Sequence, residues 1–209
     1  MAVSSKSKNQ VEKKKAVISY WSKEKMNCPV CKKNFDREIM MSGNGRMIAG
    51  GLSDELHRNF EPSARFGKIY PLIYEIGACP FCYTALLWND FKELKNKETL
   101  DRLFETRGDR FNKVETIFPH FNLKKERNLY DGCAMYYLSI LTYSLVNPEL
   151  VPTMKSAFLT LRLAWLSKEL NSVCPGHNFD YISQVFYRKA LFFYQQAVEN
   201  EQNRTEKSS

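Results

Sequence analysis

Two short cysteine motifs restrict the fold more than any other feature of this 209-residue sequence: CPVC at residues 28–31 and CPFC at residues 79–82. In each, a two-residue spacer lets both sulfurs point the same way, and proline stiffens the turn by fixing its φ angle. Two such turns, placed face to face, supply four thiolates, a complete tetrahedral set for zinc. The sequence therefore predicts one structural Zn²⁺ ion with the ligands Cys28, Cys31, Cys79 and Cys82.

The two motifs are 47 residues apart in the sequence, more than the ~15–20 of compact zinc sites. Because the cost of loop closure grows only logarithmically with length, the longer gap costs on the order of 1 kcal/mol. This is small beside an apparent zinc-binding free energy of ~10–16 kcal/mol. The long spacing is therefore compatible with a zinc site.

Other roles for the paired cysteines stay open. A thioredoxin-like redox pair would need one motif at the start of a helix that follows a strand. The first motif is instead followed by KKNFD, which is typical of a turn and then a strand. A catalytic zinc ion keeps an open position and usually has a histidine or carboxylate ligand, so four cysteines argue against chemistry at the metal.

A second metal site is a further alternative, in the segment SVCPGHNFD. Cys174 and His177 would need a partner there, either Cys133 or His120. The Pro-Gly pair at residues 175–176 favours a helix-terminating turn instead.

Composition limits the class of protein. With 44% hydrophobic and 13% aromatic residues, the chain can form a core, which excludes a disordered protein. Six cysteines are too few for a disulfide-stapled secreted domain. No signal peptide is visible at the N-terminus, and residues 132–148, uncharged throughout, predict a buried core helix in preference to a membrane span. We expect a cytoplasmic protein.

The net charge of +8 is concentrated at one end of the chain. Residues 1–25 hold seven lysines against two glutamates, so that +3 is left for the rest. Four zinc-bound thiolates would lower this remainder to about +1. The basic character therefore belongs mostly to an N-terminal tail.

The hydrophobic pattern predicts an α+β, mostly α fold, in which a small zinc-ribbon-like β module precedes a helical domain. The segments are a basic flexible tail (1–25), the zinc-ribbon-like module (26–88), the helical domain (89–200) and a disordered tail (201–209). Strands are expected at 35–41 and 70–76, with a long loop at 42–67. Helices are expected at 89–106, 126–146, 152–170 and 179–200, the last with Asp180 as its N-cap.

No catalytic signature accompanies the cysteines. Residues 43–51 are glycine-rich, but they lack the Gly-Lys-Ser/Thr ending of a phosphate loop. The three histidines, His57, His120 and His177, are scattered. We therefore expect a protein without enzymatic activity, although a pocket in the helical domain could still serve an enzyme.

Three stretches carry a resemblance to a known family: the two cysteine motifs, YPLIYEIGACPFC, and LRLAWLSKEL followed by YRKALFFYQQA. Over residues 26–200 the chain resembles the bacterial family called domain of unknown function 2225. The resemblance implies a zinc-ribbon-like start, a tetratricopeptide-like helical remainder, the four cysteine ligands and no established activity. Family members often carry glycine after the second cysteine of a motif, where this chain has Lys32 and Tyr83.

The spacing of Ala190, Tyr194 and Ala197 also matches the second helix of a tetratricopeptide repeat, although no second copy of such a repeat is evident. These features together predict a non-enzymatic zinc protein that acts as an interaction or scaffold module for a protein partner. The alternative is a nucleic-acid-binding zinc ribbon that uses its basic N-terminal tail.

Overall fold

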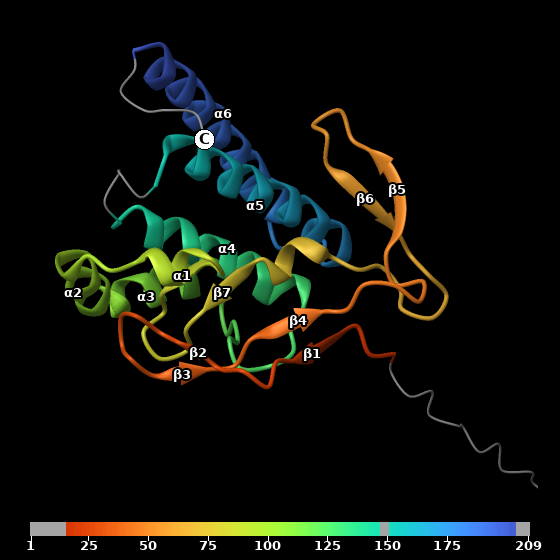
Figure 1. The fold of residues 1–209 in the computed structure, drawn as a ribbon. Helices are drawn as coiled ribbons and strands as arrows, with labels where there is room; N and C mark the ends of the chain where they lie inside the picture. Colours follow the sequence, from red (N-terminus) through yellow and green to blue (C-terminus); the bar gives the residue numbers. More distant parts are fainter. Residues whose placement is uncertain (1–15, 147–150, 204–209) are drawn as a thin grey trace, which may run out of the picture. The chain divides into compact units, whose positions relative to one another are not determined.

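The computed structural model describes residues 16–146 and 151–203 (Figure 1). The chain forms two compact units: Met1–Tyr20 with Met41–Ile69, and Trp21–Met40 with Tyr70–Ser209. Strand β1 (Ser19–Trp21) crosses the boundary between them. These units divide the chain differently from the segments expected from sequence, whose boundaries stay a prediction. Much of the two expected tails, 1–15 and 204–209, lies outside the described residues.

The first unit contains a β-hairpin where the sequence predicted a loop. Strands β5 (Ile48–Leu52) and β6 (Arg58–Glu61) pair antiparallel. Ser53 closes the turn, because its hydroxyl accepts hydrogen bonds from two backbone N–H groups, of Glu55 and His57. Such serine-based turns replace backbone turns, and they can form a hairpin in a segment whose strand residues are mostly weak strand formers. The loop expectation was therefore wrong here.

The second unit holds both cysteine motifs, each in a β-hairpin. Strands β2 (Met26–Asn27) and β3 (Asn34–Phe35) flank the first motif, and β7 (Ile76–Ala78) and β8 (Ala85–Leu87) flank the second. Strand β4 (Glu38–Met40) follows the first hairpin. The strands thus bring each motif to the tip of its own antiparallel hairpin.

The segment before the second motif departs from the expected strand. Residues Pro71–Tyr74 form a 3₁₀ helix, η1, with proline in its first turn. That position suits proline, whose missing N–H is not needed there. The alternation of Tyr70, Leu72, Tyr74 and Ile76 therefore reflects a strand only from Ile76 onward.

The rest of the second unit is helical, as expected, and the α+β, mostly α fold class is confirmed. The helices are α1 (Asp90–Glu93), α2 (Lys97–Glu105), α3 (Arg107–Ile117), α4 (Leu129–Tyr143), α5 (Thr153–Val173) and α6 (Phe179–Gln202). The helix expected at 89–106 is interrupted because Asn96 caps a new helix by accepting from the Thr99 N–H. Helix α6 begins directly after Asn178, which has a φ of 58°, so Asp180 is not its N-cap.

Helix α4 is the centre of the core in this unit. Its residues are mostly buried, and it packs against η1, β7, β8, α3 and α5. Two side chains of α4 accept hydrogen bonds from β8: Thr142 from the Ala85 N–H and the Tyr143 hydroxyl from the Leu87 N–H. The described part of residues 132–148 is thus a core helix, and none of the helices described here is long and apolar enough to cross a membrane.

Helices α5 and α6 form an antiparallel pair (Figure 1). At the end of the pair away from the α5–α6 connection, the Asn200 side chain donates to the Thr153 hydroxyl. Nearer the connection, the Ser183 hydroxyl donates to the Ala164 carbonyl. A single helical pair of this kind is compatible with a tetratricopeptide-like repeat, which stays a prediction.

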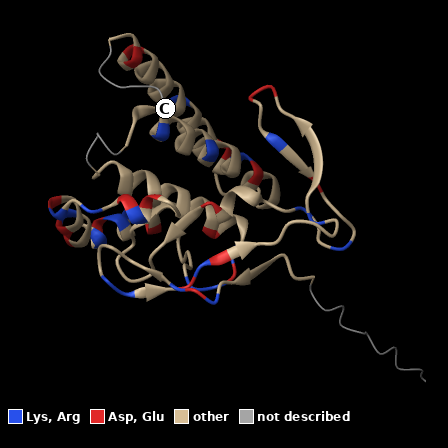
Figure 2. Ribbon diagram, in the orientation of Figure 1, with Lys and Arg blue, Asp and Glu red and all other residues tan. Residues whose placement is uncertain are grey.

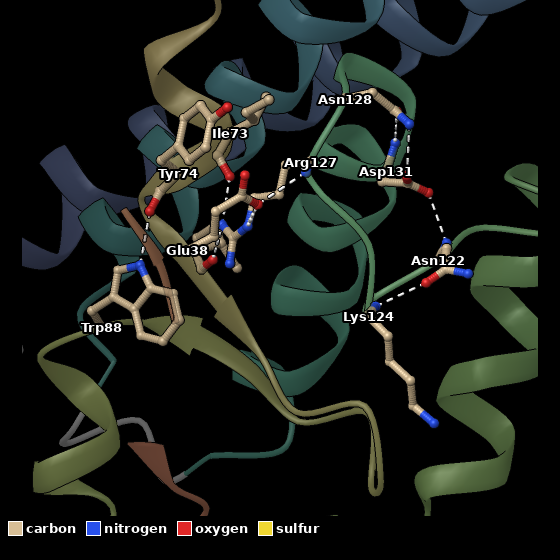
Figure 3. A network of polar contacts seen from close by, with 10 residues as sticks. Glu38, Ile73, Tyr74, Trp88, Asn122, Lys124, Arg127, Asn128 and Asp131 are labelled. Carbon is tan, nitrogen blue, oxygen red and sulfur yellow. Dashed lines mark hydrogen bonds and ion pairs between the residues drawn. The ribbon is translucent and has the colours of Figure 1, made fainter. Parts of the chain in front are cut away.

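A buried ion pair holds the segment that leads into the second motif (Figure 3). The side chains of Arg127 and Glu38 are 5% and 1% exposed. Arg127 donates to the carbonyls of Ile73 and Ile76 at 2.7 and 2.6 Å, and its backbone N–H donates to Glu38. Burial lowers the pKa of Arg127 to about 10, so it stays charged at neutral pH. The pair therefore fixes η1 and β7 relative to β4.

Beside it, Asn128 and Asp131 cap the start of α4 reciprocally (Figure 3). The Asn128 side chain accepts from the Asp131 N–H and donates to the Asp131 carboxylate. Asp131 also accepts from the Asn122 N–H at 2.7 Å. These contacts give the backbone N–H groups of Asn122 and Asp131 hydrogen-bond acceptors. Both oxygens of the Asp131 carboxylate accept a hydrogen bond.

A glycine on α4 allows its close approach to η1. A Cβ atom at Gly132 would lie 2.4 Å from a side-chain atom of Ile73, whereas one at Gly108 on α3 would meet nothing within 4 Å. We expect Gly132→Ala to destabilise the protein by about 1–3 kcal/mol, because overpacking outweighs the helix propensity of alanine. Gly108→Ala should leave stability unchanged or raise it by up to about 1 kcal/mol. Urea unfolding measures both, and equal effects would contradict the close contact.

Candidate metal centre

The two cysteine motifs have the same backbone structure. In the first, the Cys28 N–H donates to the Lys33 carbonyl, and the Lys32 N–H donates to the Cys28 carbonyl. The second repeats this pattern with Cys79, Thr84 and Tyr83, at distances within 0.1 Å of those in the first. Each connection, at 28–33 and 79–84, is thus a hydrogen-bonded knuckle that projects both of its sulfurs to one side.

The residue after the second cysteine of each knuckle is left-handed. Lys32 has a φ of 60° and Tyr83 a φ of 54°, a region that glycine enters without strain. The tyrosine ring packs 4.8 Å from the ring of Phe111, centroid to centroid, while Lys32 is exposed. Both turns therefore form without glycine. At Tyr83 the ring contact with Phe111 offsets part of the cost of the left-handed conformation, and the exposed Lys32 has no such ring contact.

Lys32→Gly is therefore expected to stabilise the metal-loaded protein by about 1 kcal/mol, since it removes the cost of a left-handed non-glycine residue. Tyr83→Gly should destabilise it, because the ring contact is lost. Thermal unfolding measures both variants. Lys33→Gly is the matched control, with an ordinary φ, and a gain as large as that of Lys32→Gly would contradict the strain at position 32.

The knuckles bring their four sulfur atoms together. All four lie within 4.8 Å of one another. The Sγ atoms of Cys28 and Cys82 are 3.5 Å apart, and those of Cys31 and Cys79 are 3.6 Å apart. A tetrahedral ion with Zn–S bonds of ~2.3 Å would place its sulfurs ~3.8 Å apart. The cluster is therefore a candidate site for one metal ion of this size.

Water has little access to this cluster. Cys28, Cys79 and Cys82 are 0% exposed, and Cys31 is partly buried. The hydrogen bond from Cys28 lowers the pKa of Cys82, which Thr84 lowers further. Hydrogen bonding to Cys28 and Cys82 raises the pKa of Cys79. The four thiols therefore interact with one another through short sulfur–sulfur contacts.

A buried arginine lies next to the second knuckle. Arg110 on α3 is 2% exposed. Its guanidinium donates to the carbonyls of Cys82, Tyr83 and Leu103 at 2.9, 3.1 and 2.7 Å, and to the Thr106 hydroxyl at 2.7 Å. Burial lowers the pKa of Arg110, whereas the nearby Cys82 raises it. The guanidinium thus places a positive charge beside the sulfurs while its hydrogen bonds go to uncharged oxygens.

The model of the family described as "uncharacterized protein conserved in bacteria (DUF2225)" matches residues 21–209. The chain belongs to this family. An uncharacterized protein of Borreliella burgdorferi is 35% identical over 191 residues, which are 90% of this chain and 67% of that protein. No solved structure matches the chain. The resemblance to domain of unknown function 2225 is thereby confirmed, and no activity comes with it.

The residues of the suggested second metal site are not brought together in this family member. Within residues 16–146 and 151–203, the four-cysteine cluster is the one group of three or more potential ligands close enough to hold an ion. Cys133 is buried within α4, and burial raises its pKa. Cys174 is exposed at the C-cap of α5, and Gly176 has a φ of 88°. This segment is therefore a turn, the favoured interpretation.

Arg110 is the residue beside the candidate site that sequence reasoning missed. Its segment, GDRFNKVETI, is polar and shows no marked amphipathic period. An arginine in such a segment is normally exposed. Only its distance from the Cys82 carbonyl, 28 residues away in the chain, distinguishes it.

Proposed function

We propose that the four cysteines hold one structural zinc ion, and that the protein works without catalysis as an interaction module for a protein partner. The gathering of four sulfurs within 4.8 Å carries the metal part of this proposal. Zinc suits a set of four thiolates in a tetrahedron better than magnesium or calcium, which prefer oxygen ligands. Arg110 adds support, because zinc with four thiolates has a net charge of −2 that a buried cation offsets.

A structural role is the one that four thiolates favour, since they fill every position of a tetrahedral zinc ion. The two knuckles come from hairpins of two and three facing residue pairs. Strand pairs this short are marginal without further support. Zinc would therefore act by joining two weak hairpins into one module.

Exposed apolar side chains on α6 support a protein partner. Leu191, Phe192 and Val198 are 60%, 58% and 49% exposed, and they lie within three turns of the same helix. A helix face of this kind is typical of docking surfaces. These side chains therefore support the prediction that the helical domain docks the partner.

Nucleic-acid binding remains a second candidate, and one observation favours it. Trp21 and Phe81, 39% and 41% exposed, line a hollow of about 210 Å³ together with Lys124 and the Lys25–Asp36 ion pair. Exposed rings beside lysines suit unpaired bases. Such binding should weaken steeply between ~50 and ~200 mM salt. It should also be abolished by deleting residues 1–25, if the basic tail provides it.

Native mass spectrometry of the metal-replete protein tests the metal part of the proposal. One zinc ion per chain is expected. Two ions would show a second site, for which Cys174 and His177 would be the first residues to substitute, and would reopen the question of catalysis. A chain without any metal would refute the zinc proposal.

A further inference from the structure

We infer that a groove beside the first knuckle is a docking site for an acidic protein segment, one whose carboxylates flank an aliphatic side chain. The inference rests on the proposed function and names the chemistry of the partner. The groove has a volume of about 510 Å³ and lies between the β2–β3 hairpin and the α1–α2 region. Three lysines line it, Lys32, Lys92 and Lys95, and no acidic residue does.

Among the described residues, these three lysines have no carboxylate partner, as is also true of Lys113 and Lys168, but these three line one groove. By contrast, Lys25 pairs with Asp36 at 3.3 Å, and Lys155 pairs with Asp90 at 2.8 Å. Like charges gathered around one groove repel one another. A ligand with negative charges would relieve this repulsion, so the groove is complementary to carboxylates.

The fold sets the positions of these lysines. Lys32 follows the second cysteine of the first knuckle, in the β2–β3 connection whose basic residues are blue in Figure 2. Lys92 belongs to α1, and Lys95 immediately precedes Asn96, the cap of α2. The lysines thus converge from two segments of the chain, and Lys32 depends on the first knuckle for its position.

The floor of the groove is apolar, and this decides between kinds of partner. Met26 and Leu100 are half-buried there, and Phe91 and Leu94 are buried, at 3% and 5% exposure. Binding of single-stranded nucleic acid favours stacking of bases on exposed aromatic rings. The ring of Phe91 is too deeply buried for such stacking. Half-exposed aliphatic groups instead suit a leucine or isoleucine side chain. An acidic protein segment therefore fits this groove better than a nucleic acid does.

A peptide selection with the zinc-loaded full chain tests the inference. A phage-displayed library of random dodecapeptides is selected on the wild-type protein, and the leading peptide is synthesised with a fluorescein label. We expect enriched peptides with acidic residues around a leucine, isoleucine or valine. Lys92→Glu with Lys95→Glu should weaken binding about tenfold or more, since each lost attraction becomes a repulsion. Raising NaCl from ~50 to ~500 mM should weaken it as well.

The control protein carries Lys113→Glu and Lys168→Glu, which make the same change in net charge at exposed positions on α3 and α5. It should bind the peptide as wild type does. Lys92→Ala provides a milder variant if the double reversal disturbs folding, and it should weaken binding by severalfold.

Three outcomes would overturn the inference: no enriched peptide, enriched peptides without acidic residues, or equal binding by the two doubly substituted proteins. Binding of a fluorescein-labelled oligo(dT) that depends on Lys92 and Lys95, without peptide binding, would make the groove a nucleic-acid site instead. The zinc count separates the two proposals. A chain with one zinc ion and no peptide binding refutes only the docking site, whereas a chain without zinc refutes the proposed function.

Discussion

Cys79→Ser is expected to release the zinc ion and to lower the melting temperature by about 10 °C or more, as a loss of about 3–5 kcal/mol implies for a chain of this size. Serine is a poor zinc ligand, and three thiolates leave the tetrahedron open. Structural zinc binds with an apparent free energy of ~10–16 kcal/mol, which matches or exceeds the ~5–15 kcal/mol stability of a typical domain. Metal loss should therefore remove most of the order of the knuckles.

The two hairpins should respond unequally. Strands β2 and β3 face each other through two residue pairs. Strands β7 and β8 have three pairs, and α4 accepts hydrogen bonds from β8 through Thr142 and Tyr143. Without zinc, amide hydrogen exchange should rise more in residues 26–35 than in residues 76–87. Helices α5 and α6, which pack on each other, should keep their protection.

Cys174→Ser is the matched control for this experiment. Cys174 is an exposed cysteine outside the cluster, so its loss should change neither the zinc content nor the melting curve. Zinc content by native mass spectrometry and exchange by mass spectrometry give the two readouts. A Cys79→Ser protein with native zinc content and an unchanged melting curve would contradict a structural metal at this site.

Much of the candidate site follows from local sequence. A CPxC motif specifies its own turn, because the spacing of the cysteines and the fixed φ of proline act within a few residues. This explains why Cys28, Cys31, Cys79 and Cys82 could be grouped from spacing alone, and the structure brings their sulfurs together. The left-handed φ of Lys32 and Tyr83 is a conformation that glycine adopts without strain, so the sequence has no local signal for it at these two positions.

Features that depend on distant partners could not be found in this way. Helix α3 was missed because its segment is polar and only Val114 and Arg110 are buried along it. The burial of Glu38 depends on Arg127, which lies 89 residues further along the chain. Neither residue differs in sequence from an ordinary surface charge. The burial of these charged residues depends on contacts with residues far away in the sequence, which local propensity does not specify.

Arg110→Met is expected to have the second large effect. Methionine fills a similar volume but leaves the carbonyls of Cys82, Tyr83 and Leu103 without their donor. Each unsatisfied buried acceptor costs about 1–3 kcal/mol. The substitution also removes the cation beside the proposed zinc site, which would have a net charge of −2. We expect a loss of about 3–5 kcal/mol in stability and zinc affinity about 10–100-fold weaker.

Two further variants separate charge from packing. Arg110→Lys keeps the positive charge but cannot reach all four oxygens, so it should lose stability while retaining most of the zinc affinity. Arg107→Met makes the same chemical change at an exposed neighbour on α3, and it should alter stability by less than about 0.5 kcal/mol. Competition with a zinc chelator measures affinity, and urea unfolding measures stability.

The comparison of Arg110→Met with Arg110→Lys decides what the guanidinium does. If zinc affinity falls equally in both, the hydrogen bonds to the second knuckle matter and the charge does not. If it falls only in Arg110→Met, the buried cation offsets the charge of the thiolates. We expect the second result, because the buried guanidinium lies beside the second knuckle, where it donates to the Cys82 carbonyl at 2.9 Å. An arginine without a buried carboxylate partner is then explained by the metal site itself.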